Sequence, residues 1–106
     1  MIKYEIKKGY EEVSWKDRKK IMPGITVDTD GDKEPELIAE FDTLEEARKE
    51  LKKYESSIWL LSGGAGAYYG IEEYYIEENE YEEDGEWVDG GSIWEFSKMD
   101  LSKIAD

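Results

Sequence analysis

The feature that most limits what this chain can fold into is a long, aromatic-rich stretch in its second half. Residues 68–82 are rich in Tyr and Ile, which favour pleated strands, and Asp84-Gly85 follows as a pair typical of tight hairpin turns. We predict a long strand over 68–82, a turn at Asp84-Gly85 and a return strand at 86–88. A second turn at 89–92 then leads to a last strand at 93–96. Strands joined by such short turns pair antiparallel.

The first half of the chain supplies shorter strands. Residues 2–7 alternate between apolar and charged side chains, which predicts a strand with one buried face. Residues 25–28 and 36–41 flank a turn-rich segment at 29–35, as the two strands of a hairpin would. The apolar run at 58–61 indicates a buried strand.

The clearest predicted helix covers residues 44–54. Thr43 suits the N-cap position, and Glu46, three residues later, completes a capping box. An apolar stripe at helical spacing supports the helix; it consists of Leu44, Ala47, Leu51 and Tyr54. Residues 9–23 are compatible with a loop or with one short helix, and 63–67 predict a glycine-rich loop.

The length and composition fit one domain over residues 1–106. A typical domain holds roughly 100 to 150 residues, and the 39% of hydrophobic residues provide material for a core despite 40% of charged ones. The expected fold is α+β, with a mostly antiparallel sheet of four to six strands packed against one main helix at about 44–54.

The chain contains neither cysteine nor histidine. Disulfides, thiolate metal sites and Cys nucleophiles are therefore excluded, as are the catalytic triads that depend on histidine. No segment approaches the ~20 apolar residues of a membrane helix, and the N-terminus has no signal-peptide pattern. We expect a cytoplasmic protein that acts by binding, with no enzymatic activity, no cofactor and no membrane contact.

The charge is distributed unevenly along the chain, whose formal net charge is −14. Residues 1–54 contain 12 basic and 14 acidic side chains, whereas residues 55–106 contain 2 basic and 14 acidic ones. Between Ile71 and Phe96 there is no Lys or Arg, but there are eleven carboxylates: Glu72, Glu73, Glu77, Glu78, Glu80, Glu82, Glu83, Asp84, Glu86, Asp89 and Glu95. Like charges facing each other destabilise a sheet, so we expect these acids to serve a purpose other than stability.

That purpose is predicted to be the imitation of a polyanion. Along a strand, the nine acids of residues 72–86 would be spaced roughly 5 to 6 Å apart, the same order as the ~3.4 Å between phosphates of a nucleic-acid strand. Such a surface attracts a basic, nucleic-acid-binding protein without binding nucleic acid itself. Interleaved Tyr and Trp side chains suit an interface, although they suit a core equally well. The predicted partner-binding residues are Glu72, Glu73, Tyr74, Glu77, Glu78, Glu80, Glu82, Glu83, Asp84, Glu86 and Trp87.

In three features the chain resembles small acidic accessory proteins of phages and mobile elements. They are the small size, the strand-to-helix junction at 41–48 and the hairpin formed by 72–78 and Asp84-Gly85. Some proteins of that kind, including anti-CRISPR inhibitors, act as acidic decoys. The resemblance implies an inhibitor or modulator of a nucleic-acid-handling protein such as a CRISPR effector, and it assigns no functional residue.

One alternative is a domain that responds to Ca²⁺ or to a small ligand. Residues 28–37 resemble the calcium loops of FG-GAP repeats, and Asp28, Asp30, Asp32 and Glu36 occupy the acidic positions of that pattern. Lys33 stands where the pattern usually has glycine, and an ordinary polar hairpin explains the segment as well. A generic protein-interaction module is a further alternative.

Overall fold

The structure, a computed structural model, describes residues 1–14, 16, 21, 24–28, 35–62 and 67–99. Within these residues it has an α+β fold with six strands, one α-helix and a short 3-10 helix, which confirms the predicted fold class. In chain order the elements are β1 (Ile2–Ser14), η2 (Ile25–Asp28), β2 (Glu36–Phe41), α1 (Leu44–Leu51), β3 (Glu55–Ser62), β4 (Tyr68–Tyr81), β5 (Trp87–Phe96) and β6 (Lys98–Met99).

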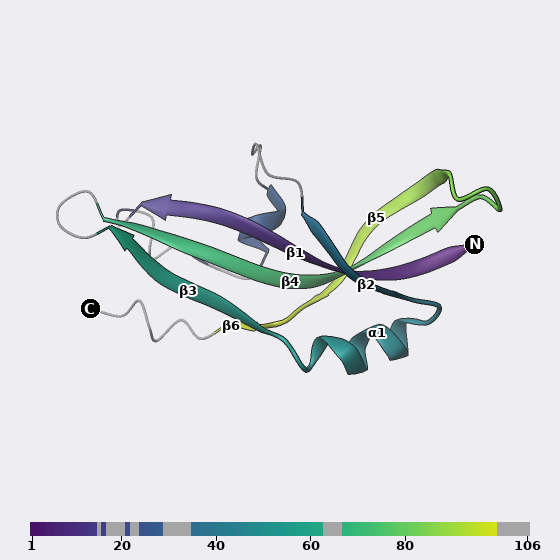
Figure 1. Ribbon diagram of the computed structural model, residues 1–106, viewed down its shortest axis with the longest axis horizontal. Coiled ribbons are helices and arrows are strands. Elements are labelled where there is room, and N and C mark those ends of the chain that lie inside the picture. The colour runs from purple at the N-terminus through teal and green to yellow at the C-terminus, as the bar shows by residue number, and fades with distance from the viewer. Residues whose placement is uncertain (15, 17–20, 22–23, 29–34, 63–66, 100–106) are drawn as a thin grey trace.

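The sheet is organised around the long strand β4. β1 pairs antiparallel with β4 along its whole length, from Ile2 opposite Glu80 to Ser14 opposite Tyr68. On the other side, β3 pairs with the first part of β4 and β5 with the last part. β2 extends the sheet beyond β1, and β6 pairs in parallel with the start of β3. The molecule measures 52 × 27 × 17 Å, and the β4–β5 turn and the end of β3 lie at opposite ends of its long axis (Figure 1).

Each face of the sheet has its own hydrophobic core, because side chains alternate between the two faces along β4. Ile6 and Ile76 are partners in the β1–β4 ladder, and Ala47 and Leu51 of α1 pack on them. Ile71, five residues before Ile76, points to the opposite face. It is part of a second cluster with Val13, Ile21, Ile58 and Tyr69. The helix therefore covers one face at one end of the sheet, and the region around η2 covers the other face at the other end.

The helix begins as predicted but ends earlier. The Thr43 hydroxyl oxygen accepts a hydrogen bond from the Glu46 backbone N–H at 3.2 Å and donates one to the Glu46 carboxylate at 2.9 Å. The last turn is tightened, since Tyr54 N–H donates to the Leu51 carbonyl, and α1 ends at Leu51. Tyr54 lies outside the helix and stacks on Tyr74, with ring centroids 4.7 Å apart.

The predicted hairpin of 25–28 with 36–41 is wrong. Residues 25–28 form the 3-10 helix η2, closed by a hydrogen bond from the Val27 N–H to the Gly24 carbonyl, and β2 pairs with β1 instead. The physical reason is that the carboxylate of Glu73 binds Gly24 and Thr26, as described below, and holds this segment against the sheet. Strand β1 continues to Ser14, so residues 9–14 are neither loop nor helix.

Two predictions about the ends of the sheet also need correction. Residues 89–92 do not make a turn, because β5 is continuous and absorbs Gly90 and Gly91, both at positive φ, through irregularities in its pairing with β4. The 58–61 strand exists as part of β3, but only Ile58 is buried. Leu60 is 56% exposed, in the part of β3 where no described strand pairs with the outer side. The predicted loop at 63–67 falls mostly outside the described residues.

Candidate functional site

One of the predicted surface acids, Glu73, belongs to the core. Its side chain is fully buried, and its carboxylate oxygens accept hydrogen bonds from the Gly24 N–H at 2.9 and 3.0 Å and from the Thr26 hydroxyl at 3.0 Å. A buried carboxylate is stabilised by such donors in place of water. Glu73 therefore fastens η2 to the sheet and is not available to a partner.

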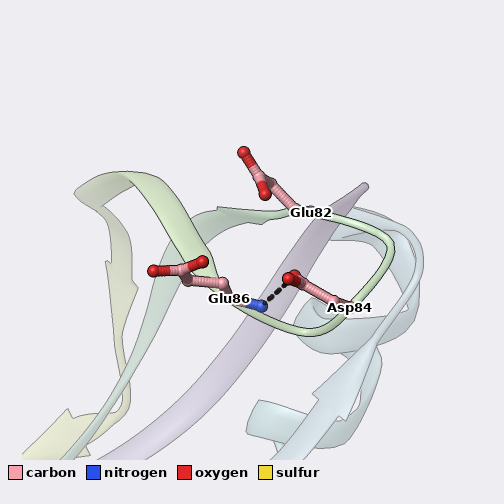
Figure 2. A group of neighbouring side chains, drawn as sticks. All are labelled: Glu82, Asp84 and Glu86. Carbon is pink, nitrogen blue, oxygen red and sulfur yellow. Dashed lines mark hydrogen bonds between the residues drawn. The ribbon is translucent and has the colours of Figure 1, made fainter.

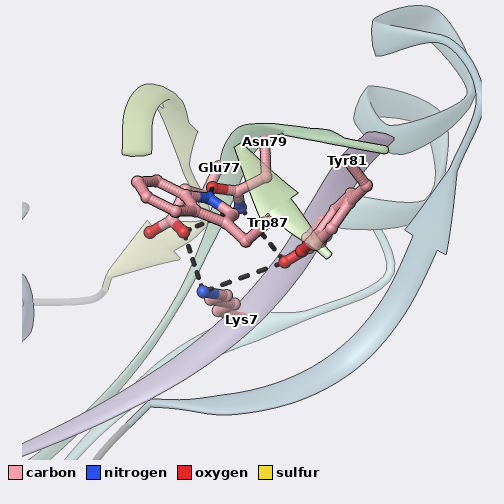
Figure 3. A network of polar contacts seen from close by, with 6 residues as sticks. Lys7, Glu77, Asn79, Tyr81 and Trp87 are labelled. Atoms are coloured by element: carbon pink, nitrogen blue, oxygen red, sulfur yellow. Dashed lines mark hydrogen bonds and ion pairs between the residues drawn. The ribbon is translucent and has the colours of Figure 1, made fainter. Parts of the chain in front are cut away.

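Glu77 belongs to a polar network on the face of the sheet opposite α1. Lys7 Nζ donates to Glu77 Oε1 at 2.7 Å and lies 3.8 Å from Glu5 Oε1. The Asn79 side-chain amide bridges the same two carboxylates, at 2.9 Å from Glu77 and 3.2 Å from Glu5 (Figure 3). Glu5 and Asn79 are each only 3% exposed. One lysine and one amide thus hold both carboxylates, of which Glu77 lies in the stretch that has no Lys or Arg of its own.

Two aromatic side chains complete this network. The Tyr81 hydroxyl donates to the Glu5 carboxylate, and this hydrogen bond, with burial and nearby charge, raises the pKa of Tyr81 to about 12. The Trp87 indole N–H donates to the Asn79 side-chain oxygen at 2.9 Å, so the network orients the indole although 55% of Trp87 is exposed (Figure 3). Asn79 is the single asparagine of the chain. In the sequence, this network is indicated by the single amide side chain, that of Asn79, within the run of carboxylates on β4.

Three further acids have partners on neighbouring elements. Lys8 Nζ lies 3.8 Å from Glu72 Oε2, and Arg48 Nε lies 3.8 Å from Glu95 Oε2. Burial and the neighbouring Glu78 carboxylate raise the pKa of Tyr4. Tyr74, also predicted to bind a partner, packs beside Ile6 and Ile76 in the core on the α1 side.

The remaining acids form what we call the acidic arm, residues 80–89, made of the end of β4, the turn and the start of β5. All of its carboxylates are exposed: Glu80, Glu82, Glu83, Asp84, Glu86 and Asp89. Among the residues that the structure describes, no Lys or Arg forms an ion pair with any of them. The sequence prediction named five of these six acids and missed Asp89.

The turn at the tip of the arm concentrates this charge. Gly85, at φ 88°, lets the chain reverse, with hydrogen bonds from the Gly85 N–H to the Glu82 carbonyl and from the Glu82 N–H to the Glu86 carbonyl. Carboxylate oxygens of Glu82, Asp84 and Glu86 lie within 4.8 Å of one another (Figure 2). Asp84 also accepts a hydrogen bond from the Glu86 N–H at 3.0 Å, which fixes its position in the turn.

The arm also presents apolar surface beside its charges. Val88 is 48% exposed, and it borders an open depression of about 640 Å³ that is otherwise lined by Met1 and residues 80–84. Trp87 lies next to Val88 at the start of β5. The arm thus combines unpaired carboxylates, an oriented indole and a shallow concave surface.

Of the four predicted metal ligands, the structure describes Asp28 and Glu36. Asp30 and Asp32 fall outside the described residues, and Asp28 is the last residue of η2. Glu36 is exposed at the start of β2, with its carboxylate 3.2 Å from Lys8 Nζ, and this hydrogen bond raises the pKa of Lys8. Glu36 is therefore already engaged with a cation, its own neighbour across the β1–β2 pair.

Comparison with protein-family models, curated proteins and solved structures gives no match to this chain. Within the described ranges, no helix has the length and apolar character needed to cross a membrane.

Proposed function

We propose that this chain is a non-enzymatic binding protein whose acidic arm engages the basic surface of a nucleic-acid-handling protein and competes there with nucleic acid. The observation that carries the proposal is the separation of charge within the sheet. Along β4 as far as Asn79 the acids are buried, paired or bonded to a neighbour, whereas the six carboxylates of the arm are exposed at one end of the molecule (Figure 1).

The charge density of the arm supports a polyanion decoy. The carboxylates of Glu82, Asp84 and Glu86 approach within 4.8 Å, which is the same order as the ~3.4 Å between phosphates along a nucleic-acid strand. Charges that are concentrated and unpaired produce a strong local potential, which speeds encounter with a basic cleft.

The oriented indole of Trp87 supports a specific contact with the partner in addition to electrostatic attraction. Trp is enriched among the residues that dominate binding energy, and a side chain held in one orientation loses less conformational freedom on binding. The Asn79 hydrogen bond gives Trp87 such an orientation. We infer that the carboxylates of the arm steer the partner and that Trp87 and Val88 anchor it.

The chemistry of the chain supports binding over catalysis. Histidine and cysteine are missing from the whole sequence, and the carboxylates of Glu5 and Glu77 are bound by Lys7 and Asn79. The proposed partner class is defined by its basic, nucleic-acid-binding surface. A CRISPR effector is one protein of that class, in line with the resemblance to anti-CRISPR decoys.

A capture experiment at two salt concentrations tests the proposal. The immobilised protein and its variant E80Q/E82Q/E83Q/E86Q are exposed to a lysate at about 50 and about 500 mM salt, and retained proteins are identified. We expect basic nucleic-acid-binding proteins on the parent at low salt, and few on the variant or at high salt. Retention of the same proteins by parent and variant at both salt concentrations contradicts the proposal.

A further inference from the structure

Besides the two-residue strand β6, the sheet has three exposed edges in the described part of the chain, and two of them are protected against pairing with another strand. β2 has Glu36 and Glu40 along its length. β5 has Asp89 and Glu95, and Gly90 and Gly91 interrupt its regular pairing. Charges and irregularities of this kind are the usual means by which edge strands avoid edge-to-edge association.

The third edge, residues 57–62 of β3, lacks this protection. It consists of Ser57, Ile58, Trp59, Leu60, Leu61 and Ser62, without one charged side chain. Its inner side pairs with β4, while β6 covers the outer side only at Glu55 and Ser56. Among the described residues, no strand pairs with the outer side from 57 to 62. Backbone groups that have no partner among the described residues, together with an apolar sequence, make this edge a template for another strand.

Exposed apolar side chains gather along the same edge. Trp59, Leu60 and Leu61 are 37%, 56% and 44% exposed, and Tyr68 beside them on β4 is 49% exposed. Trp59 is held in place, because a Cβ on Gly70 would lie only 2.7 Å from its ring. The ring of Tyr10 packs against it with centroids 5.9 Å apart. The patch is thus an ordered surface of the sheet.

We propose that this β3 edge pairs with the β3 edge of a second copy of the chain, antiparallel and about a two-fold axis. Such an interface brings the same patch of both copies together, so the patch must complement itself. With a net charge of −14, two copies repel one another wherever acidic surfaces meet. The uncharged edge at 57–62 is the place where they can approach without juxtaposing carboxylates, whereas β2 or β5 would place acid against acid.

This pairing has a consequence for the shape of the assembly. The end of β3 and the acidic arm lie at opposite ends of the long axis (Figure 1). A dimer through β3 therefore holds its two arms far apart at its outer ends. Such a dimer can engage two basic sites at once, which strengthens attachment to a repetitive or multimeric partner. The dimer itself does not depend on the proposed function of the arm.

Sedimentation equilibrium over about 1 to 300 μM protein tests the dimer. The edge at 57–62 has far fewer residues than the ~20 to 30 per side of a standard interface, so we expect a reversible dimer with a dissociation constant of the order of 100 μM. L60K/L61K should weaken it at least tenfold, and L60K alone less. The matched control is L37K, because Leu37 is 52% exposed on the β2 edge; it should leave the association unchanged.

Salt and amide hydrogen exchange give independent readouts. Salt should strengthen the dimer, because screening relieves the repulsion between the copies. Some backbone amides of 57–62 already bond to β4; those that point away from β4 should become protected as protein concentration rises. Three results each overturn the proposal: a monomer at every concentration, equal weakening by L37K, or strong protection of these amides in the monomer. The last would mean that the chain covers its own edge.

Discussion

Lys7 Nζ lies 2.7 Å from Glu77 Oε1, across the β1–β4 pair and 70 residues away in the sequence. This contact marks a boundary along β4. Up to Asn79 the acids are buried, paired or bonded to a neighbour, and from Glu80 onward they are exposed in the arm. The same network that neutralises Glu77 also orients Trp87 within the arm.

Removing the Lys7 ammonium tests the network. We expect Lys7→Met to lower the free energy of unfolding by about 2 kcal/mol, because Glu5 and Glu77 lose their shared counter-charge in a largely buried site. Adding Glu77→Gln should restore part of the loss, giving a measurable coupling in a double-mutant cycle by urea denaturation. Lys3→Met is the control. It removes an exposed ion pair with Asp42 and should lower stability much less, because exposed ion pairs contribute little. If Lys7→Met and Lys3→Met lower the free energy of unfolding equally, the network adds no stability beyond that of an exposed ion pair.

Glu73 should behave as a structural residue only. Glu73→Gln places an amide NH₂ among the N–H and hydroxyl donors of Gly24 and Thr26, and we expect a loss of about 2 kcal/mol of stability. Thr26→Val should cost about 1 kcal/mol. Hydrogen exchange at the Gly24 amide should accelerate in both. If Glu73→Gln instead slows partner binding while stability is unchanged, this assignment is wrong.

Alkaline pH should destabilise the fold through Tyr75 and Tyr81. Burial raises the pKa of Tyr75 to about 12, and the hydrogen bond to Glu5 raises the pKa of Tyr81 to about 12, both from 10.0. A higher pKa in the folded protein means that the folded state keeps the proton better than the unfolded state. The resulting stability is fully present below pH 10 and is lost as the pH rises from about 10 to about 12. Urea denaturation across this range should show a shallower fall for Tyr81→Phe and Tyr75→Phe. If stability falls with pH as steeply in the two Phe variants as in the parent, these tyrosines do not cause the loss.

Trp87 should control how long the partner stays bound. Trp87→Ala removes the half-exposed indole, and we expect the dissociation rate constant to rise about tenfold while the association rate constant changes little. Trp94→Ala is the matched control, because Trp94 is 47% exposed further along β5, away from the arm. An equal effect of both substitutions would place the anchor elsewhere.

Local patterns made part of the fold predictable. The alternation at 2–7, the Tyr- and Ile-rich composition of 68–82 and the Thr43–Glu46 capping pair depend on residues close in sequence. The strands at 36–41 and 68–81 and the start of α1 are found where expected, whereas β1 extends beyond residue 7 to Ser14. The Ile25-Thr-Val segment also has local strand propensity. It forms η2 instead, because Glu73, 47 residues beyond Thr26, binds this segment.

The candidate site was predictable in composition but not in extent. The sequence shows a run of carboxylates, yet which of them are neutralised depends on strand register and on Lys7, Lys8 and Arg48 from distant elements. The apolar run in β3 was predicted to be buried. An apolar run is compatible both with a buried strand and with an exposed edge strand. Only the order of strands distinguishes the two.

The central claim, that the unpaired carboxylates of the arm recognise a basic partner, is tested most directly by association kinetics. The association rate constant of a captured partner is measured against salt concentration for three proteins: the parent, E80Q/E82Q/E83Q/E86Q and E12Q/E36Q/E45Q/E55Q. Both variants remove four negative charges from exposed positions, but only the first removes them from the arm. We expect the arm variant to associate about tenfold more slowly at low salt, with a shallower salt dependence, and the control to stay within about twofold of the parent. Equal rates for the two variants, or a larger loss in the control, would contradict the claim.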